Sequence, residues 1–190
     1  TTAGESHGPG LVTIIEGVPA GLELDLEALD RDMARRQLGH GRGARMAIEK
    51  DHAEFVGGVR FGRTTGAPIA LLLKNRGTEQ ISTRPAGYQP LLFPRPGHAD
   101  LPAAIKYGLD DVRDVLERAS ARETAARVAL GACAKQLLAE FDIRVHSFVE
   151  GIGAVGGRFP ERISDAARRR AERSPVRFTA WRDGREQALQ

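Results

Sequence analysis

Residues 120–141 read SARETAARVALGACAKQLLAEF, and this stretch does most to decide the fold. Apolar residues recur in it every three or four positions and predict one stripe along a long helix: Ala126, Leu130, Cys133, Leu137 and Phe141. The alanines between them favour helix further. Ser120 followed by Glu123 fits a capping box, which predicts that the helix starts at Ala121.

Strands and shorter helices flank this segment. The predicted strands are residues 11–16, 54–59, 68–74 and 143–149, which are rich in β-branched and other apolar residues. Leu26, Leu29 and Met33 predict an amphipathic helix capped by Asp25, and residues 161–172 predict a charged helix with an alanine face. Residues 76–97 are rich in Pro and Gly and predict a loop. We therefore expect an α+β fold.

Composition narrows the class of protein. At 190 residues and 41% hydrophobic content the chain can bury a real core, so disorder is excluded. Net charge is only +3, but arginines cluster in residues 31–45 and 162–173, which favours acidic small molecules or nucleic acid as partners. The single Cys133 excludes an internal disulfide and a multi-cysteine metal site. No apolar run is long enough to cross a membrane.

The two ends of the chain suggest a piece of a longer protein. Thr1 comes directly before a motif, and the last residues stop inside a polar pattern typical of a helix. A basic and apolar leader of the secretory type is missing at the start. We expect a fragment of a cytoplasmic enzyme.

Two histidines lie in short glycine-containing motifs, GESHG at residues 4–8 and RPGHAD at residues 95–100. Histidine is the side chain most easily poised between acid and base near neutral pH, and neighbouring glycines let the backbone approach a ligand. Asp100, two residues after His98, can orient the His98 ring. His7 fits a general acid or a metal ligand, but no second ligand lies at helical spacing, so we predict no metal site.

Arginines add two candidate anion sites. RRQLGHGRGAR at residues 35–45 fits a basic cradle for phosphate or carboxylate, and equally a flexible loop that touches RNA nonspecifically. The lack of aromatic residues there weakens the RNA alternative. Arg118 and Arg122 flank the predicted start of the long helix, where free N–H groups attract anions. An ordinary helix cap with solvated arginines explains that pattern as well.

Three paired blocks, taken together, resemble the chorismate synthase family. They are residues 4–8 with 16–19, residues 35–37 with 41–43, and residues 95–100 running into ERASARETAARV at 117–128. The resemblance runs from Gly4 to about Val155 and weakens over 156–190, so we treat residues 1–190 as one truncated domain. It implies the β-α-β sandwich core of that family, incomplete in this fragment, and a homotetramer without nucleic acid or membrane partners.

The resemblance also implies a function and its residues. Such lyases of the shikimate pathway convert 5-enolpyruvylshikimate 3-phosphate to chorismate and phosphate by an anti 1,4-elimination that requires reduced FMN. By motif position, His7 is implied as the acid near the leaving phosphate, and His98 as the residue that keeps the flavin correctly protonated. The implied ligand contacts are Arg118, Ala119 and Ser120 for FMN, Arg36 and Arg42 for NADPH or a substrate anion, and Ser6, Arg45 and Arg122 for the substrate.

The chain departs from the family in three respects. Asn75-Arg76-Gly77 stands where the family usually has Asn-x-Asp, and residues 78–94 match the family poorly. The later half with its further flavin segment and catalytic Asp is not in these 190 residues. We therefore expect the fragment alone to be inactive. Two other hypotheses remain open: an RNA-contacting basic module, and a noncatalytic assembly subunit that uses its Ala-rich and Arg-rich helices as interfaces.

Overall fold

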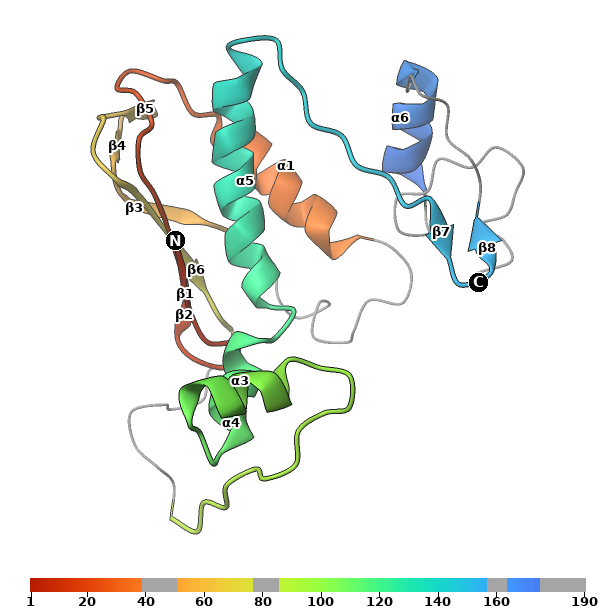
Figure 1. Ribbon diagram of the computed structural model, residues 1–190. Helices are drawn as coiled ribbons and strands as arrows, with labels where there is room; N and C mark the ends of the chain where they lie inside the picture. The colour runs from red at the N-terminus through yellow and green to blue at the C-terminus, as the bar shows by residue number, and fades with distance from the viewer. Residues whose placement is uncertain (39–50, 77–85, 157–163, 175–190) are drawn as a thin grey trace.

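A computed structural model describes residues 1–38, 51–76, 86–156 and 164–174. Its centre is an antiparallel sheet of four strands in the order β1-β2-β6-β3 (Figure 1). The strands are β1 (Thr2–Gly4), β2 (Gly10–Ile15), β6 (Ile69–Lys74) and β3 (Glu54–Gly57). The pairing of β2 with β6 runs from Gly10 opposite Lys74 to Ile15 opposite Ile69, so these two strands form the sheet's best-paired part.

A long helix, α5 (Glu123–Ala139), packs against this sheet, and α1 (Leu26–Gln37) packs against α5 (Figure 1). The buried side chains of α5 are all small: Ala125, Ala126, Ala129, Ala132 and Cys133. Small residues let neighbouring backbones approach closely, and leucines of the sheet and α1 fill the remaining space. The core therefore lies between β2, β6, α5 and α1.

A helix pair, α3 (Asp100–Tyr107) and α4 (Val112–Arg118), lies at one end of the sheet and leads into α5 (Figure 1). It has its own small apolar cluster around Ala104, Val112 and Val115. The remaining elements are the short strands β4 (Val59–Arg60), β5 (Arg63–Thr64), β7 (Gly151–Ile152) and β8 (Val155–Gly156), and the helix α6 (Asp165–Arg173). Within the described residues, no helix has both the length and the apolar content of a membrane span.

Several predicted elements are confirmed, and so is the α+β class. The predicted strands at 11–16 and 68–74 correspond to β2 and β6. Asp25 caps α1 as expected, since its Oδ1 accepts from the Glu27 N–H at 2.8 Å. The predicted strand at 54–59 divides at Gly58 into β3 and β4, because Gly58 has φ +78° and directs the chain out of the sheet.

The predicted start and apolar stripe of the long helix are wrong in detail. The helix begins at Glu123, and the capping box is absent, because the Glu123 carboxylate accepts from Thr2 Oγ1 and Arg127 Nε, both at 2.7 Å. Ser120 Oγ accepts from the Arg122 N–H instead, at 3.2 Å. Phe141 lies beyond the helix with 70% of its surface exposed. The buried face is thus the alanine face, and the larger residues lie at its margins.

The predicted strand at 143–149 is also wrong, because residues 143–148 join no ladder among the described residues. Alternating apolar residues give only the tendency to form a strand, and the partner strand has to be supplied by the fold. The predicted charged helix corresponds to α6, which Ser164 caps and which buries Ala167 and Ala171. The helices α3 and α4 were not predicted.

Candidate active site

The His7 site is built from the β1–β2 loop and from Glu117 in the last turn of α4. The loop starts at Gly4, where φ is +102° and a Cβ would lie 2.3 Å from the Gly10 carbonyl oxygen, so only glycine fits. Glu117 Oε1 lies 2.7 Å from His7 Nδ1. Glu117 Oε2 accepts from Ser6 Oγ and from the His7 backbone N–H, both at 2.8 Å. One carboxylate thus holds the side chains of both Ser6 and His7.

Burial within the His7 site is uneven. The His7 side chain is 41% exposed, whereas Ser6, predicted to contact substrate, is 1% exposed and faces Glu117. Burial opposes the ionisation of Glu117, but hydrogen bonds from His7 and Ser6 outweigh it and lower the Glu117 pKa. The site therefore presents an imidazole to solvent and places an anion behind it.

Asn75, directly after β6, holds the same loop from the other side. Its Nδ2 donates to the carbonyl oxygens of Glu5, Ser6 and Gly8 at 3.0, 3.2 and 2.7 Å. Its Oδ1 accepts from Arg122 Nε at 2.9 Å. Because Asn75 is 7% exposed, these contacts replace water as its partners. Asn75 therefore links the loop to Arg122.

Two predicted anion-binding arginines, Arg36 and Arg122, share Asp51. Arg36 Nη2 lies 2.5 Å from Asp51 Oδ2, and Arg122 Nη1 pairs with Asp51 Oδ1. The side chains of Arg36, Arg122 and Asp51 are 9%, 5% and 0% exposed. Two guanidiniums thus share one buried carboxylate beside the His7 loop. Such buried arginines are held in fixed positions before any ligand arrives.

The second candidate centre, the His98 site, lies at the start of α3. Asp100, the first residue of α3, is fully buried and accepts from Arg95 Nε and Nη2, both at 2.8 Å. The Arg95 guanidinium holds the pKa of Asp100 far below its usual range. His98 Nδ1 lies 3.1 Å from Asp100 Oδ1 and 3.0 Å from Arg95 Nη2, with the His98 side chain 37% exposed. Asp100 therefore directly contacts the His98 ring that it is expected to orient.

The predicted flavin contacts, Arg118, Ala119 and Ser120, form the turn between α4 and α5. Arg118 donates to the Thr2 carbonyl oxygen at 2.9 Å, to Thr2 Oγ1 at 2.7 Å and to the Gly4 carbonyl oxygen at 3.3 Å. The Arg118 side chain remains 41% exposed. This turn therefore brings a partly exposed cation to the base of the His7 loop.

Some predicted residues lie outside the described part of the chain. Arg42 and Arg45 belong to residues 39–50, as does most of the basic segment 35–45 on which the RNA-contacting alternative rests. Within the described residues no cluster of three or more His, Cys, Asp or Glu side chains could hold a metal ion.

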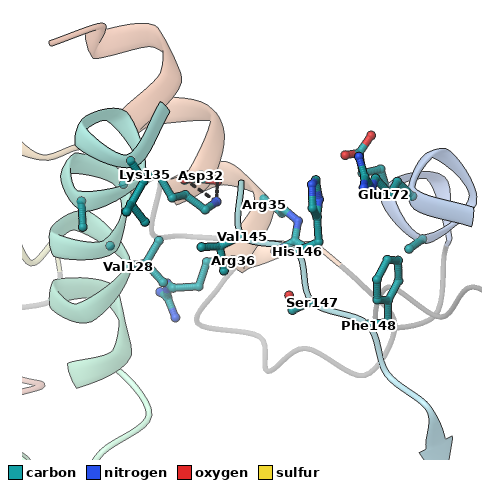
Figure 2. Close-up of a pocket in the computed structure, with 16 residues that line it drawn as sticks. Asp32, Arg35, Arg36, Val128, Lys135, Val145, His146, Ser147, Phe148 and Glu172 are labelled. Carbon is teal, nitrogen blue, oxygen red and sulfur yellow. Dashed lines mark hydrogen bonds and ion pairs between the residues drawn. The ribbon is translucent and has the colours of Figure 1, made fainter. Parts of the chain in front are cut away.

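A cavity of about 630 Å³ lies between α1, α5, α6 and the segment that carries His146 (Figure 2). Of the predicted site residues that the structure describes, only Arg36 lines it, and neither His7 nor His98 does. His146 and Phe148 extend into the space between α5 and α6 (Figure 2), and burial lowers the pKa of His146. This cavity is therefore separate from the two motif histidines.

Sequence reasoning missed two residues that organise these sites. Glu117 lies 110 positions from His7, and Asp51 lies 71 positions from Arg122. Neither separation produces a periodic or motif signal. Glu117 was nevertheless the first residue of the 117–128 block, and a search for a carboxylate in that block could have identified it.

Comparisons with known proteins match this chain to one family. The sequence model described as chorismate synthase matches residues 1–188. The chorismate synthase of Symbiobacterium thermophilum is 54% identical over 189 residues, covering 93% of this chain and 48% of the relative. That of Rubrobacter xylanophilus is 54% identical over 183 residues, covering 93% and 46%. The chain thus spans about half the length of these curated relatives.

A solved structure agrees with the sequence relatives. A crystal structure of chorismate synthase superposes with a TM-score of 0.74 at 40% identity, covering 100% of this chain and 50% of that chain. The likeness to this family therefore extends from the sequence to the fold.

Proposed function

Because this chain belongs to the chorismate synthase family, we propose that it supplies half of a lyase active site. The reaction is the conversion of 5-enolpyruvylshikimate 3-phosphate to chorismate and phosphate by anti 1,4-elimination. The observation that carries the proposal is that both motif histidines are anchored through Nδ1 to carboxylates of one helix pair, Glu117 of α4 and Asp100 of α3. We propose that the 190 residues alone are inactive.

The elimination needs an acid and fixed cations, because negative charge develops on the departing phosphate. His7 is the acid that protonates this phosphate, and the guanidiniums of Arg36 and Arg122 attract it. Arg45 also binds the substrate. Ser6 acts through Glu117, since its hydroxyl donates to that carboxylate and its surface is 1% exposed.

The turn at residues 118–120 fits one edge of a flavin. Arg118 is a partly exposed donor there, Ala119 packs against the apolar cluster of α3 and α4, and Ser120 adds a hydroxyl. Reduced FMN, when bound, lends electron density to the elimination and receives it back. His98 holds the proton that keeps this flavin in its working protonation state. Arg36 and Arg42 contact NADPH in members that reduce their own flavin.

The family also suggests the setting of the whole protein. We propose that residues 1–190 are one domain, and that the sheet with α5 and α1 is one side of a β-α-β sandwich that the rest of the relatives' length completes. We further propose a cytoplasmic homotetramer that binds no nucleic acid and no membrane.

A chimera tests the proposed reaction. The 190 residues replace the corresponding half of the Symbiobacterium thermophilum relative, and chorismate formation is followed anaerobically with reduced FMN. We expect turnover by the chimera and none by the 190 residues alone. His7→Ala and His98→Ala should each lower turnover by about 10²–10⁴-fold, the usual contribution of a general acid or base.

His52→Ala is the matched control, because His52 is an exposed histidine that also pairs with a carboxylate, Asp30, at 2.8 Å. Its turnover should equal that of the parent chimera. A folded chimera without turnover would contradict the proposed reaction, and full turnover after His98→Ala would contradict the role of His98.

Flavin binding tests the proposed role of the turn at residues 118–120 independently of the chimera. Reduced FMN titrated anaerobically should bind the chain saturably and more tightly when 5-enolpyruvylshikimate 3-phosphate is present. Arg118→Ala should weaken FMN binding more than substrate binding, because Arg118 is proposed to contact the cofactor. The reverse order would reassign this turn to the substrate.

A further inference from the structure

We infer that Glu117 is a positioning residue that keeps a proton on His7 Nδ1. Neutral His7 is then the Nδ1–H tautomer, and Nε2 is the atom that gains a second proton in the imidazolium and delivers it, which returns the ring to the Nδ1–H tautomer. The tautomer follows from the contacts of the free chain alone. The delivery of a proton to the departing phosphate rests on the proposed function.

The first step concerns the contact between Glu117 and the His7 ring. An ionised carboxylate can only accept hydrogen bonds. Glu117 is ionised near neutral pH, since its hydrogen bonds to His7 and Ser6 lower its pKa despite burial. The 2.7 Å contact between Glu117 Oε1 and His7 Nδ1 therefore requires a proton on Nδ1. Neutral His7 then has its lone pair on Nε2.

The second step concerns Ser6, whose hydroxyl excludes the other tautomer. Ser6 Oγ lies 2.8 Å from Glu117 Oε2 and 3.1 Å from His7 Nδ1. The single hydroxyl proton goes to the carboxylate, so Ser6 presents a lone pair toward Nδ1. Both groups that face Nδ1 in these contacts thus accept a hydrogen bond.

The third step concerns the rigidity of the arrangement. The Glu117 backbone carbonyl oxygen accepts from the Ser6 N–H at 3.2 Å, and its side chain accepts from the His7 N–H at 2.8 Å. The loop is therefore bound to the end of α4 through its backbone as well as its side chains. A ring held in this way has both its tautomer and its direction set before substrate binds.

The His98 site differs from the His7 site in the groups that lie beside Nδ1. His98 Nδ1 lies 3.0 Å from a donor, Arg95 Nη2, and 3.1 Å from an acceptor, Asp100 Oδ1. Arginine can only donate, so one neighbour favours a bare Nδ1 and the other a protonated one. A carboxylate beside a histidine is thus not sufficient to fix its tautomer, and Glu117 differs because the other group beside Nδ1 also accepts.

Ring-nitrogen NMR of the uniformly ¹⁵N-labelled 190-residue chain tests the inference without flavin or substrate. At a pH where the histidines are neutral, two-bond proton–nitrogen correlations identify which ring nitrogen carries the proton. We expect His7 to be protonated at Nδ1. In Glu117→Gln, which keeps the side-chain shape, the Nδ1–H to Nε2–H ratio should fall by about tenfold or more, as expected for loss of a hydrogen bond to a charged group.

Two further variants complete this test. Glu117→Ala removes the acceptor entirely and should shift the ratio at least as far. Asp30→Asn is the matched control, because it neutralises the exposed carboxylate beside His52 and should leave the His7 signals unchanged. An Nε2–H form of His7 in the unaltered chain, or an unchanged ratio in folded Glu117→Gln, would overturn the assignment.

The chimera separates this inference from the proposed function. Glu117→Gln should lower kcat by about tenfold or more, a part of the general-acid contribution, with KM changed less than about twofold. A loss confined to KM would overturn the role of Glu117 as the residue that positions the acid. An inactive parent chimera would reject the proposed reaction and leave the tautomer result standing.

Discussion

The two motif histidines are held by the same kind of group but by different kinds of connection. His98 contacts Asp100, two residues along the chain, and Arg95, three residues before it. His7 contacts Glu117, which lies 110 residues away on α4. The His98 site is thus a local turn at the start of a helix, whereas the His7 site exists only when the β1–β2 loop and α4 have been brought together.

This difference predicts different dependence on the rest of the molecule. The His7 loop is also held by Asn75, which in turn contacts Arg122 and, through it, Asp51. A change in that buried network should therefore alter the position of His7. The same change should leave the His98 turn intact as long as α3 forms.

The largest expected effect is that of Asp51→Asn, which keeps the shape of the side chain and removes its charge. Arg36 and Arg122 would then be buried without the carboxylate that they share. Removing one partner of a buried ion pair costs about 3–5 kcal/mol. We expect the free energy of unfolding, measured by urea titration at pH 7, to fall by this amount.

Asp30→Asn is the control for this loss, because Asp30 and His52 form an ion pair whose side chains are 46% and 61% exposed. Exposed pairs contribute about 0–1 kcal/mol, so the unfolding free energy should barely change. Equal losses in the two variants would mean that the Asp51 cluster contributes no more than a surface pair.

Asn75→Ala should have the next largest effect and should distinguish the two histidines. It removes the donor to three loop carbonyls and the acceptor of Arg122 Nε, all in a buried environment. Leaving buried polar groups unsatisfied costs about 1–3 kcal/mol. In the folded variant we expect the His7 ring signals to shift while those of His98 stay in place. Equal shifts of both histidines would contradict the independence of the His98 turn.

The elements that could be predicted from the sequence are those specified by neighbours along the chain. Asp25 caps α1 through the N–H of Glu27, two residues away, and β2 and β6 consist mostly of apolar residues. The helices α3 and α4 were missed although Asp111 caps α4, because eight and seven residues are too short to establish a helical period. The strand expected at 143–149 failed because the described residues supply no partner for it.

The contacts of the candidate site also fall into two groups, those between neighbours along the chain and those between distant residues. The contact between His98 and Asp100 could be expected from their spacing. Arg36 and Arg122 were expected at an anion site, but their shared partner Asp51 lies 15 and 71 residues away and gave no local signal. Glu117 was visible only as part of a motif block. What the sequence could not provide was the tertiary contact that decides which charged groups meet.

The smallest predicted effect is that of Asp100→Asn, which tests the local site through its pH dependence. Arg95 holds the folded-state pKa of Asp100 far below the value of about 3.9 in an unfolded chain. Ionised Asp100 therefore stabilises the fold above about pH 4, and this contribution is lost as the pH falls further.

At pH 7, Asp100→Asn should lower the free energy of unfolding by about 1–2 kcal/mol, since asparagine keeps one acceptor for Arg95 but loses the charge. Urea titrations at pH 7 and pH 3 should give a smaller difference from the unaltered chain at pH 3. A difference that stays constant between these pH values would mean that the neutral side chain, and not the ionised carboxylate, holds the His98 turn. The His7 ring signals should stay in place at pH 7, because the support of His7 runs through Glu117 and Asn75 and not through α3.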